Sequence, residues 1–304
     1  MKPEGFDFHS NFIEIAGYKM HYLDEGSGGV LIMLHGNPTW GYLYRNFIPE
    51  LSKEYRCIVP DFLGFGYSDK PAGEDYSLQA QSQRLAQFIE KMELNEITLV
   101  VHDIGGIVGL AWAAEHKHLV KGLVILNNSG SVPEVWGKSP YLPPWSYIVL
   151  WPLRIPVIGE VMVENLNILH RLVMPLAFSR RDVFTKKIRR GFGYPYRCKA
   201  DRKAQLSTIR QIPILKSDPI YRMLLKTGQM LNGWQVPAQI IWGLKDPSSP
   251  PRIIKVLERL LPNHRPSVVL PQAGHFLTEE QPEVVLDKIK EFLKTIDNSP
   301  NLNT

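Results

Sequence analysis

Asp103 stands where an apolar run meets a helical pattern, and its surroundings could make its carboxylate a nucleophile. The run Ile97–Val101 is typical of a buried strand, and the segment Ile107–Glu115 is typical of a helix. Gly105 and Gly106 provide small residues where a sharp strand-to-helix turn crowds the backbone. The positive end of the helix dipole favours an ionised carboxylate there. Asp is also a common helix cap, so other residues must decide between the two roles.

Asp246 and His275 also follow apolar runs and could act together with Asp103. Asp246 comes after the run Ala238–Trp242, and His275 comes after the run Ser267–Leu270. Since the carboxyl ends of parallel strands meet at one edge of a sheet, we expect the three side chains to lie close together. A nucleophile, an acid and a histidine in this chain order can form a covalent ester and then hydrolyse it. These three residues are the predicted catalytic set.

A carboxylate nucleophile suits a substrate with a tetrahedral carbon, because it can displace a leaving group in line and form an alkyl ester. His275, oriented by Asp246, would then activate a water that attacks the ester carbonyl of Asp103. The carbonyl oxygen of that ester needs hydrogen-bond donors. We expect a backbone N–H of an earlier strand-end loop, His35–Trp40, which contains Asn37, and the N–H of Ile104 to supply them.

Strands that alternate with helices must position these residues. The pattern predicts an α/β class of fold, with a mostly parallel twisted sheet and helices on both faces. An opening hairpin is expected at the sheet edge. The expected hairpin strands are 12–16 and 18–24, the further strands are 30–35, 57–60, 97–101, 120–126, 238–242 and 267–270, and the clearest helices are 77–92 and 283–296.

The alternation stops after Asn127 and resumes near Pro237, which predicts an inserted unit. We therefore expect a core domain of residues 1–128 and 233–304 and a helical cap domain of residues 129–232. Within the insertion, the segment Tyr141–Gly159 is very apolar, and Arg154 is its only charged residue. Four prolines interrupt this segment, so helices that close over an apolar cleft are expected rather than a membrane span.

Composition and charge exclude several classes of protein. Two distant cysteines cannot form a disulfide framework, and no apolar leader precedes the first strand, so we expect a cytoplasmic protein. No metal-binding spacing or complete phosphate-binding loop is present, and neither a metal nor a cofactor is expected.

The net charge is +5, and ten Lys or Arg fall within residues 180–203. This run lacks nucleic-acid-binding signatures. We expect it to be solvated, with contact to a membrane or a partner enzyme as the alternative.

Five motifs together resemble α/β-hydrolases of the haloalkane dehalogenase and epoxide hydrolase superfamily. The resemblance covers residues 12 to 295 and includes a stretch of the insertion from Pro195 to Pro213. It implies the α/β-hydrolase fold with an inserted helical cap. The branch with which it agrees best includes β-lactone decarboxylases of long-chain olefin formation. The motifs are HGNPTW (35–40), DFLGFGYSDKP (61–71), VHDIGG (101–106), GLKDP (243–247) and AGHF (273–276).

The resemblance also implies how a leaving group would be held. Asn37 corresponds to the side-chain donor that binds the departing halide in dehalogenases. Those enzymes usually have a second donor, a Trp, directly after the nucleophile, where this chain has Ile104. Trp136, Trp145 or Trp151 from the cap could replace that donor, although lining an apolar pocket is the simpler role for each.

Four functions follow from these residues. The first is haloalkane dehalogenase activity, in which an apolar haloalkane and water give an alcohol and halide. The second is decarboxylation of a β-lactone, which tolerates Ile104 better because no free halide must be held. The third is epoxide hydrolysis, since H-G-x-P is present and the cap contains tyrosines. The fourth, a non-catalytic binding protein on a hydrolase fold, is disfavoured by the intact set of Asp103, Asp246 and His275.

Overall fold

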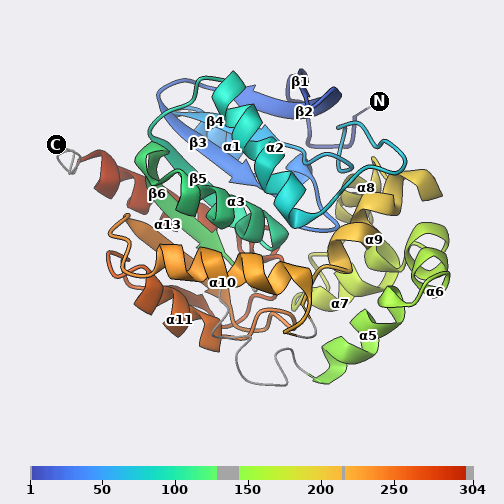
Figure 1. Cartoon of the computed structure of the whole chain (residues 1–304). Helices are drawn as coiled ribbons and strands as arrows, with labels where there is room; N and C mark the ends of the chain where they lie inside the picture. The colour runs from blue at the N-terminus through green and yellow to red at the C-terminus, as the bar shows by residue number, and fades with distance from the viewer. Residues whose placement is uncertain (1, 129–143, 214–215, 299–304) are drawn as a thin grey trace.

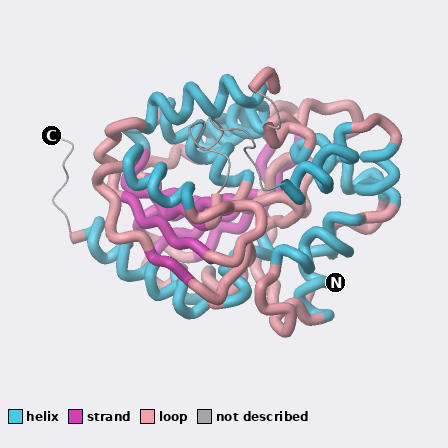
Figure 2. The backbone as a smooth tube through the Cα atoms, turned by 90° about the horizontal axis from the view of Figure 1, so that it is seen from below, coloured by secondary structure: helices cyan, strands magenta, loops and turns pink. Residues whose placement is uncertain are grey.

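The computed structural model describes residues 2–128, 144–213 and 216–298. The described chain forms an eight-stranded sheet with helices on both of its faces (Figures 1 and 2). This arrangement confirms the predicted α/β-hydrolase fold class. Among the described residues, no helix is long and apolar enough to cross a membrane.

The sheet has the strand order β1-β2-β4-β3-β5-β6-β7-β8. β1 and β2 form the predicted hairpin at one edge, and β2 pairs antiparallel with β4, whereas every later pair is parallel. The carboxyl ends of β3 and β5 to β8 therefore meet at one edge. The strands are β1 (Asn11–Ile15), β2 (Tyr18–Glu25), β3 (Gly29–Leu34), β4 (Tyr55–Pro60), β5 (Ile97–His102), β6 (Val120–Leu126), β7 (Ala238–Gly243) and β8 (Val268–Leu270).

Alternate residues of the central strands determine which helices cover which face. Gly109 of α3 lies against Leu99 and Val101 of β5, whereas Gly122 of β6 lies against Phe292 of α13. Leu99 pairs with residue 123, so these two side chains lie on the same face of the sheet. Gly122 precedes residue 123 and therefore faces the other side, which places α3 and α13 on opposite faces. α2 and α10 pack with α3, and Lys290 of α13 pairs with Glu50 of α1. These helices are α1 (Ile48–Leu51), α2 (Leu78–Lys91), α3 (Ile104–Glu115), α10 (Pro219–Leu231) and α13 (Pro282–Asp297).

Only helices are found among the described residues between β6 and β7. Figure 1 shows most of them at one end of the sheet, and we call the segment 144–209 the cap. α10, which lies within the predicted cap domain of residues 129–232, packs on α3 and α2. The cap elements are α5 (Pro144–Arg154), α6 (Ile158–Glu160), η3 (Val161–Asn165), η4 (Leu169–Val173), α7 (Met174–Ala177), α8 (Lys186–Gly193), η5 (Lys199–Arg202) and α9 (Lys203–Ile209).

Short elements complete the connections. A 3-10 turn, η1 (Gly41–Tyr44), follows β3, and η2 (Lys117–Leu119) leads into β6. α11 (Arg252–Leu260) connects β7 to β8, and α12 (Leu277–Glu280) directly follows the loop that carries His275. The predicted helices at 77–92 and 283–296 correspond to α2 and α13, and Ser77 caps α2 by accepting a hydrogen bond from the Ala80 N–H.

Candidate active site

Asp103 is the single residue between β5 and α3, and its backbone is strained. Its φ of 53° and ψ of −127° lie in a region that non-glycine residues rarely adopt. Glycines make the turn possible: a Cβ on Gly36 would lie 2.5 Å from the Cβ of Asp103, and one on Gly105 would lie 2.4 Å from the Leu34 carbonyl oxygen. The backbone thus directs the Asp103 carboxylate out of the sheet edge, as a nucleophile requires.

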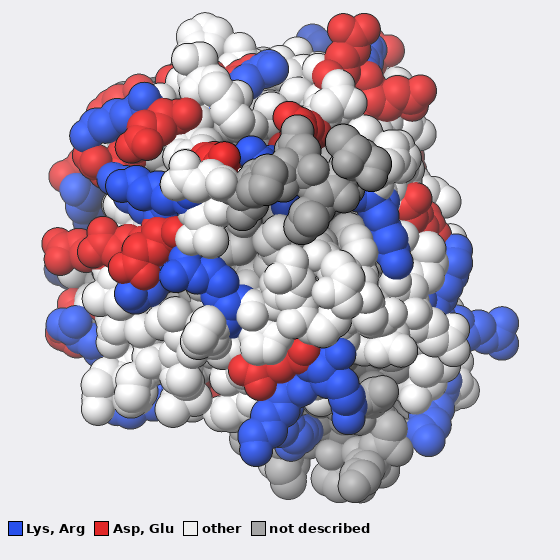
Figure 3. Space-filling model, turned by 90° about the vertical axis from the view of Figure 1, so that its left-hand side faces the viewer, with Lys and Arg blue, Asp and Glu red and all other residues white. Residues whose placement is uncertain are grey.

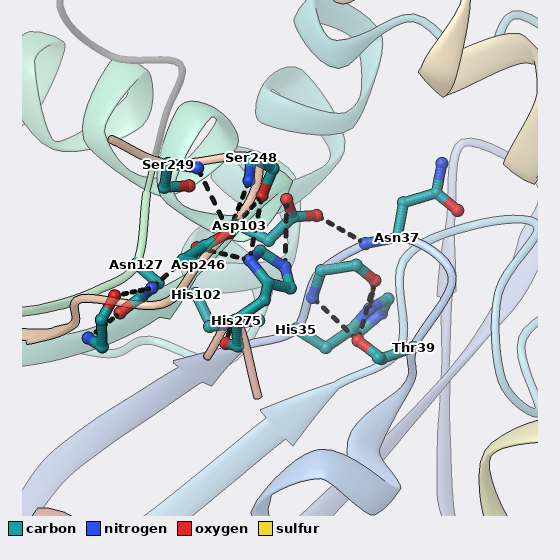
Figure 4. Close-up of polar contacts among 12 residues, drawn as sticks. His35, Asn37, Thr39, His102, Asp103, Asn127, Asp246, Ser248, Ser249 and His275 are labelled. Carbon is teal, nitrogen blue, oxygen red and sulfur yellow. Dashed lines mark hydrogen bonds and ion pairs between the residues drawn. The ribbon is translucent and has the colours of Figure 1, made fainter. Parts of the chain in front are cut away.

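The structure brings His275 and Asp246 to Asp103 from two other strand ends (Figure 4). His275 Nδ1 donates to Asp246 Oδ2 at 2.8 Å, and His275 Nε2 lies 3.6 Å from Asp103 Oδ2. His275 and Asp246 are buried. The imidazole therefore stands between two carboxylates, with one nitrogen held and the other facing the nucleophile. A water beside Nε2 would be within reach of both His275 and an ester on Asp103.

Asp246 is held by partners that the sequence did not reveal. Asn127, directly after β6, donates from its side chain to Asp246 Oδ2 at 2.6 Å. Ser248 donates from its N–H and its hydroxyl to Asp246 Oδ1, both at 2.7 Å, and the Ser249 N–H adds a third bond at 3.2 Å. Its position, as a polar residue at the carboxyl end of a strand, was the sequence signal that could have identified Asn127 as part of the site. These bonds leave the carboxylate little freedom to turn away from His275.

The charges in this group shift the pKa values of His275 and Asp246 in opposite directions. Burial lowers the pKa of His275, but the Asp246 and Asp103 carboxylates outweigh it and raise that pKa to about 9. Burial raises the pKa of Asp246, and the charge and hydrogen bond of His275 more than reverse this, so its pKa is lowered. His275 is therefore cationic at neutral pH. When Asp103 loses its charge, as it does in an ester, one of the contributions that raise the pKa of His275 is removed.

The Asn37 backbone occupies the predicted oxyanion position. Its N–H donates to Asp103 Oδ1 at 2.8 Å, on the carboxylate oxygen that does not face His275. In an Asp103 ester this oxygen can become the carbonyl oxygen, which gains negative charge when water attacks the ester. The Asn37 N–H is already placed to donate a hydrogen bond to it. Ile104 begins α3, and its N–H stays the predicted second donor.

The side chain of Asn37 contacts the cap, and its role as a halide donor stays a prediction. Its amide nitrogen donates to the Gln205 carbonyl oxygen at 2.9 Å and to Thr208 Oγ1 at 2.8 Å, both in α9 of the cap. Figure 4 shows the amide turned away from Asp103. Both N–H groups are thus used to bind the cap, and holding a halide would require the side chain to rotate and break these bonds. Sequence reasoning missed this because α9 lies far along the chain.

The predicted alternative donors are placed as follows. Ile104 is buried and has no polar side-chain atom. Trp136 lies outside the described residues, Trp145 belongs to α5, and Trp151, also in α5, has 52% of its surface exposed. No group of three or more metal-ligating side chains occurs in the described ranges.

His102, the residue before Asp103, is a further part of the site. Its Nε2–H donates to the backbone oxygen of His275 at 2.9 Å. Burial, followed by the nearby His275, lowers the pKa of His102 to about 4, so it stays neutral and fixes the loop without adding charge. The sequence placed His102 at a strand end but gave no reason to pair it with the distant His275.

Comparisons with known proteins agree with this geometry. Residues 29–282 match the family described as alpha/beta hydrolase fold. The chain is 33% identical to a cis-3-alkyl-4-alkyloxetan-2-one decarboxylase from Xanthomonas campestris pv. campestris, with 97% of this chain and 99% of that protein covered. It is 30% identical to haloalkane dehalogenase 2 from Mycobacterium bovis, covering 95% and 96%. The crystal structure of haloalkane dehalogenase DatA from Agrobacterium tumefaciens C58 superimposes with a TM-score of 0.84 at 25% identity, covering 95% and 97%.

Proposed function

The chain belongs to the alpha/beta hydrolase family, and we propose that it is an enzyme in which Asp103 forms a covalent ester with an apolar substrate. One observation carries this proposal: Asp103 Oδ1 accepts the Asn37 N–H at 2.8 Å while Oδ2 lies 3.6 Å from His275 Nε2. One carboxylate oxygen is thus stabilised, and the other is available to attack carbon. A helix cap alone would not need a charged histidine beside it.

We further propose that the substrate is a β-lactone with two alkyl substituents and that the product is an olefin. Two relatives that are 32% and 33% identical are named decarboxylases of such oxetanones. The site also suits a leaving group that stays attached to the substrate. The Ile104 side chain cannot donate a hydrogen bond, and the Asn37 amide is bound to the cap, so neither of these two side chains offers a free halide a donor. An unpartnered, desolvated anion costs several kcal/mol.

The chemistry balances without a second reactant. Asp103 attacks the tetrahedral ring carbon that is bonded to the ring oxygen, the bond between that carbon and the ring oxygen breaks, and the substrate becomes an alkyl ester of Asp103 with a free carboxylate. The carbon–carbon bond to that carboxylate then breaks and releases carbon dioxide. Its electrons form the double bond, and the bond to Asp103 breaks to restore the aspartate. The cationic His275, beside Asp103 Oδ2, can stabilise the liberated carboxylate electrostatically.

Haloalkane hydrolysis is the second candidate. It is favoured by the pair of Asp246 and His275, which has the geometry to activate water, and by relatives at about 30% identity that are named haloalkane dehalogenases. In this reaction water attacks the Asp103 ester, and an alcohol, halide and a proton are released. The loss of the Asp103 charge on ester formation would lower the pKa of His275 toward a value suited to a general base.

A parallel assay separates the two functions. The wild-type protein is given a cis-3,4-dialkyl β-lactone, a 1-bromoalkane and a terminal epoxide of matched chain length. We expect olefin from the lactone by gas chromatography, and bromide and diol formation at least 100-fold slower. Bromide release faster than olefin release would overturn the β-lactone proposal and favour the dehalogenase.

An Asp103→Asn variant tests the covalent mechanism itself. It should lose turnover of every accepted substrate by at least about 10³-fold, because the amide is a poor nucleophile. Mass spectrometry of the intact variant excludes deamidation back to Asp. Retained turnover would show that another group attacks the substrate.

A further inference from the structure

Exposed apolar side chains gather on one part of the cap. Of the fourteen large apolar residues that are exposed in the described ranges, nine lie between residues 148 and 176. We call these nine the apolar patch. They are Ile148, Trp151, Ile155, Val157, Ile158, Val161, Leu166, Leu172 and Leu176.

The patch lies on neighbouring elements at the end of the molecule opposite the C-terminus (Figure 1). α5 contacts α6, α6 contacts η3, and η4 contacts α7. Single exposed apolar residues are ordinary on a protein surface, but nine of them within one run of cap elements indicate an interaction surface. Within this segment Arg154 is paired with Asp218, and Glu160 is paired with Arg210, so the charged residues partly neutralise one another.

The positive charge of the whole chain is concentrated beside this patch. Residues 180–203 contain ten Lys or Arg and two Asp, which gives a net charge of +8, whereas the rest of the chain has −3. α8 contacts η4, and η5 contacts η3. Arg202 fixes the second contact by donating from Nε to the Glu164 carbonyl oxygen at 2.9 Å. Cationic elements therefore adjoin the elements that carry the apolar patch.

Several of these cations face solvent. Lys187 pairs with Glu4 at 2.9 Å. Lys186, Arg189 and Arg190 are exposed on α8, and none of them has an ion-pair partner within the part of the chain that the structure describes. The side of the molecule away from the cap differs, because there acidic and basic side chains lie intermixed (Figure 3).

We propose that the cap docks on an anionic lipid bilayer, with the apolar patch in the interface and the residues of the 180–203 segment on the headgroups. Apolar side chains flanked by Lys and Arg are the chemistry that binds such a surface, and Trp151 suits the boundary between headgroups and acyl chains. A second copy of this chain fits less well, since two patches in contact would bring two regions of charge +8 together.

This docking has a consequence for substrate supply. An apolar substrate partitions into a bilayer, so a cap seated there takes it from the membrane and not from water. The docking proposal does not depend on the reaction at Asp103, because the patch and the cations are surface features of the cap. Its test therefore measures binding and not turnover.

The test is sedimentation of the full-length protein with vesicles. One set contains phosphatidylcholine alone, and the other contains 30% phosphatidylglycerol. We expect at least tenfold stronger binding to the anionic vesicles, and weaker binding as salt is raised. Equal binding to both sets, or none to either, would overturn the proposal. Self-association that strengthens with salt and competes with vesicle binding would assign the patch to a second copy and would also overturn it.

Paired variants locate the binding surface. The triple change Lys186→Gln, Arg189→Gln and Arg190→Gln should lower binding by roughly 100-fold, at about fivefold per cation. Changing Ile148→Ser and Leu172→Ser should also weaken it. Matched controls elsewhere on the surface, Lys216→Gln with Arg222→Gln and Lys255→Gln, and Phe12→Ser with Val284→Ser, should bind like the wild type. Equal losses in variants and controls would show that the cap is not the docking surface.

Discussion

At the scale of single residues, His275 has different duties in the two candidate reactions. Dehalogenation needs it to activate water, whereas decarboxylation from the Asp103 ester consumes no water. We therefore expect His275→Ala to retain olefin formation from a β-lactone at a reduced rate, because a cation beside the leaving carboxylate is lost. With a 1-bromoalkane the same variant should accumulate an alkyl mass on the peptide that contains Asp103. An unmodified peptide, with binding shown separately, would argue against the Asp103 ester.

The raised pKa of His275 also predicts how stability depends on pH. A pKa of about 9 in the folded protein exceeds the value of about 6.5 expected in the unfolded chain. The stabilisation is therefore fully present below about pH 6.5 and is lost as the pH rises through about 9, a change on the order of 3 kcal/mol. Urea unfolding between pH 6 and 10 measures it. His275→Gln should flatten this dependence, whereas a change at the exposed His118 to Gln should leave it unaltered. The same slope in both variants would assign the dependence to other groups.

At the scale of elements, α12 ties the loop that carries His275 to the cap. Glu280, its last residue, accepts the Gly274 N–H at 2.9 Å and the Arg180 N–H at 2.8 Å. The His275 N–H donates to the Ala177 carbonyl oxygen at 3.0 Å, so residues 177–180 and the His275 loop form one unit. Glu280 thus positions His275, and its charge contributes to the raised pKa of that residue.

Removing the charge of Glu280 should show whether this residue positions His275 or only stabilises the fold. Glu280→Gln replaces one carboxylate oxygen, which accepts a hydrogen bond, with an amide nitrogen, which cannot. We expect kcat to fall by roughly tenfold, which corresponds to about 1.4 kcal/mol for one misplaced buried hydrogen bond. The pH–rate profile should also shift to lower pH, because the pKa of His275 falls. Glu283→Gln, an exposed change at the start of α13, is the control. A loss of stability with an unshifted profile would limit Glu280 to a structural role.

The elements also show how far the sequence could predict the site. The strands and the turn at Asp103 were predictable because apolar runs and adjacent glycines are local signals. The contact of Asn127 with Asp246 and the contacts of the Asn37 side chain were not, because they join residues 119 and about 170 positions apart. Asn37 illustrates the difference: its backbone N–H follows from the strand-end loop, whereas its side chain is directed by α9 of the cap.

At the scale of the whole molecule, the bonds from Asn37 to α9 couple the cap to the core beside Asp103. The same residue stabilises Asp103 through its N–H and holds Gln205 and Thr208 through its side chain. A displacement of α9 would therefore be transmitted to the oxyanion position. It would also free an amide donor that is otherwise bound to the cap.

Thr208→Val tests this coupling because it removes one acceptor with little change in shape. One N–H of Asn37 would lose its partner, and we expect unfolding to require about 1–3 kcal/mol less, measured by urea denaturation. If that N–H turns toward the cleft, bromide release from a 1-bromoalkane should rise relative to olefin release from a β-lactone, since a halide then gains a donor. Ser207→Ala, one residue earlier in α9, is the matched control. A stability loss with an unchanged ratio of the two activities would show that Asn37 joins cap to core without setting which leaving group the site accepts.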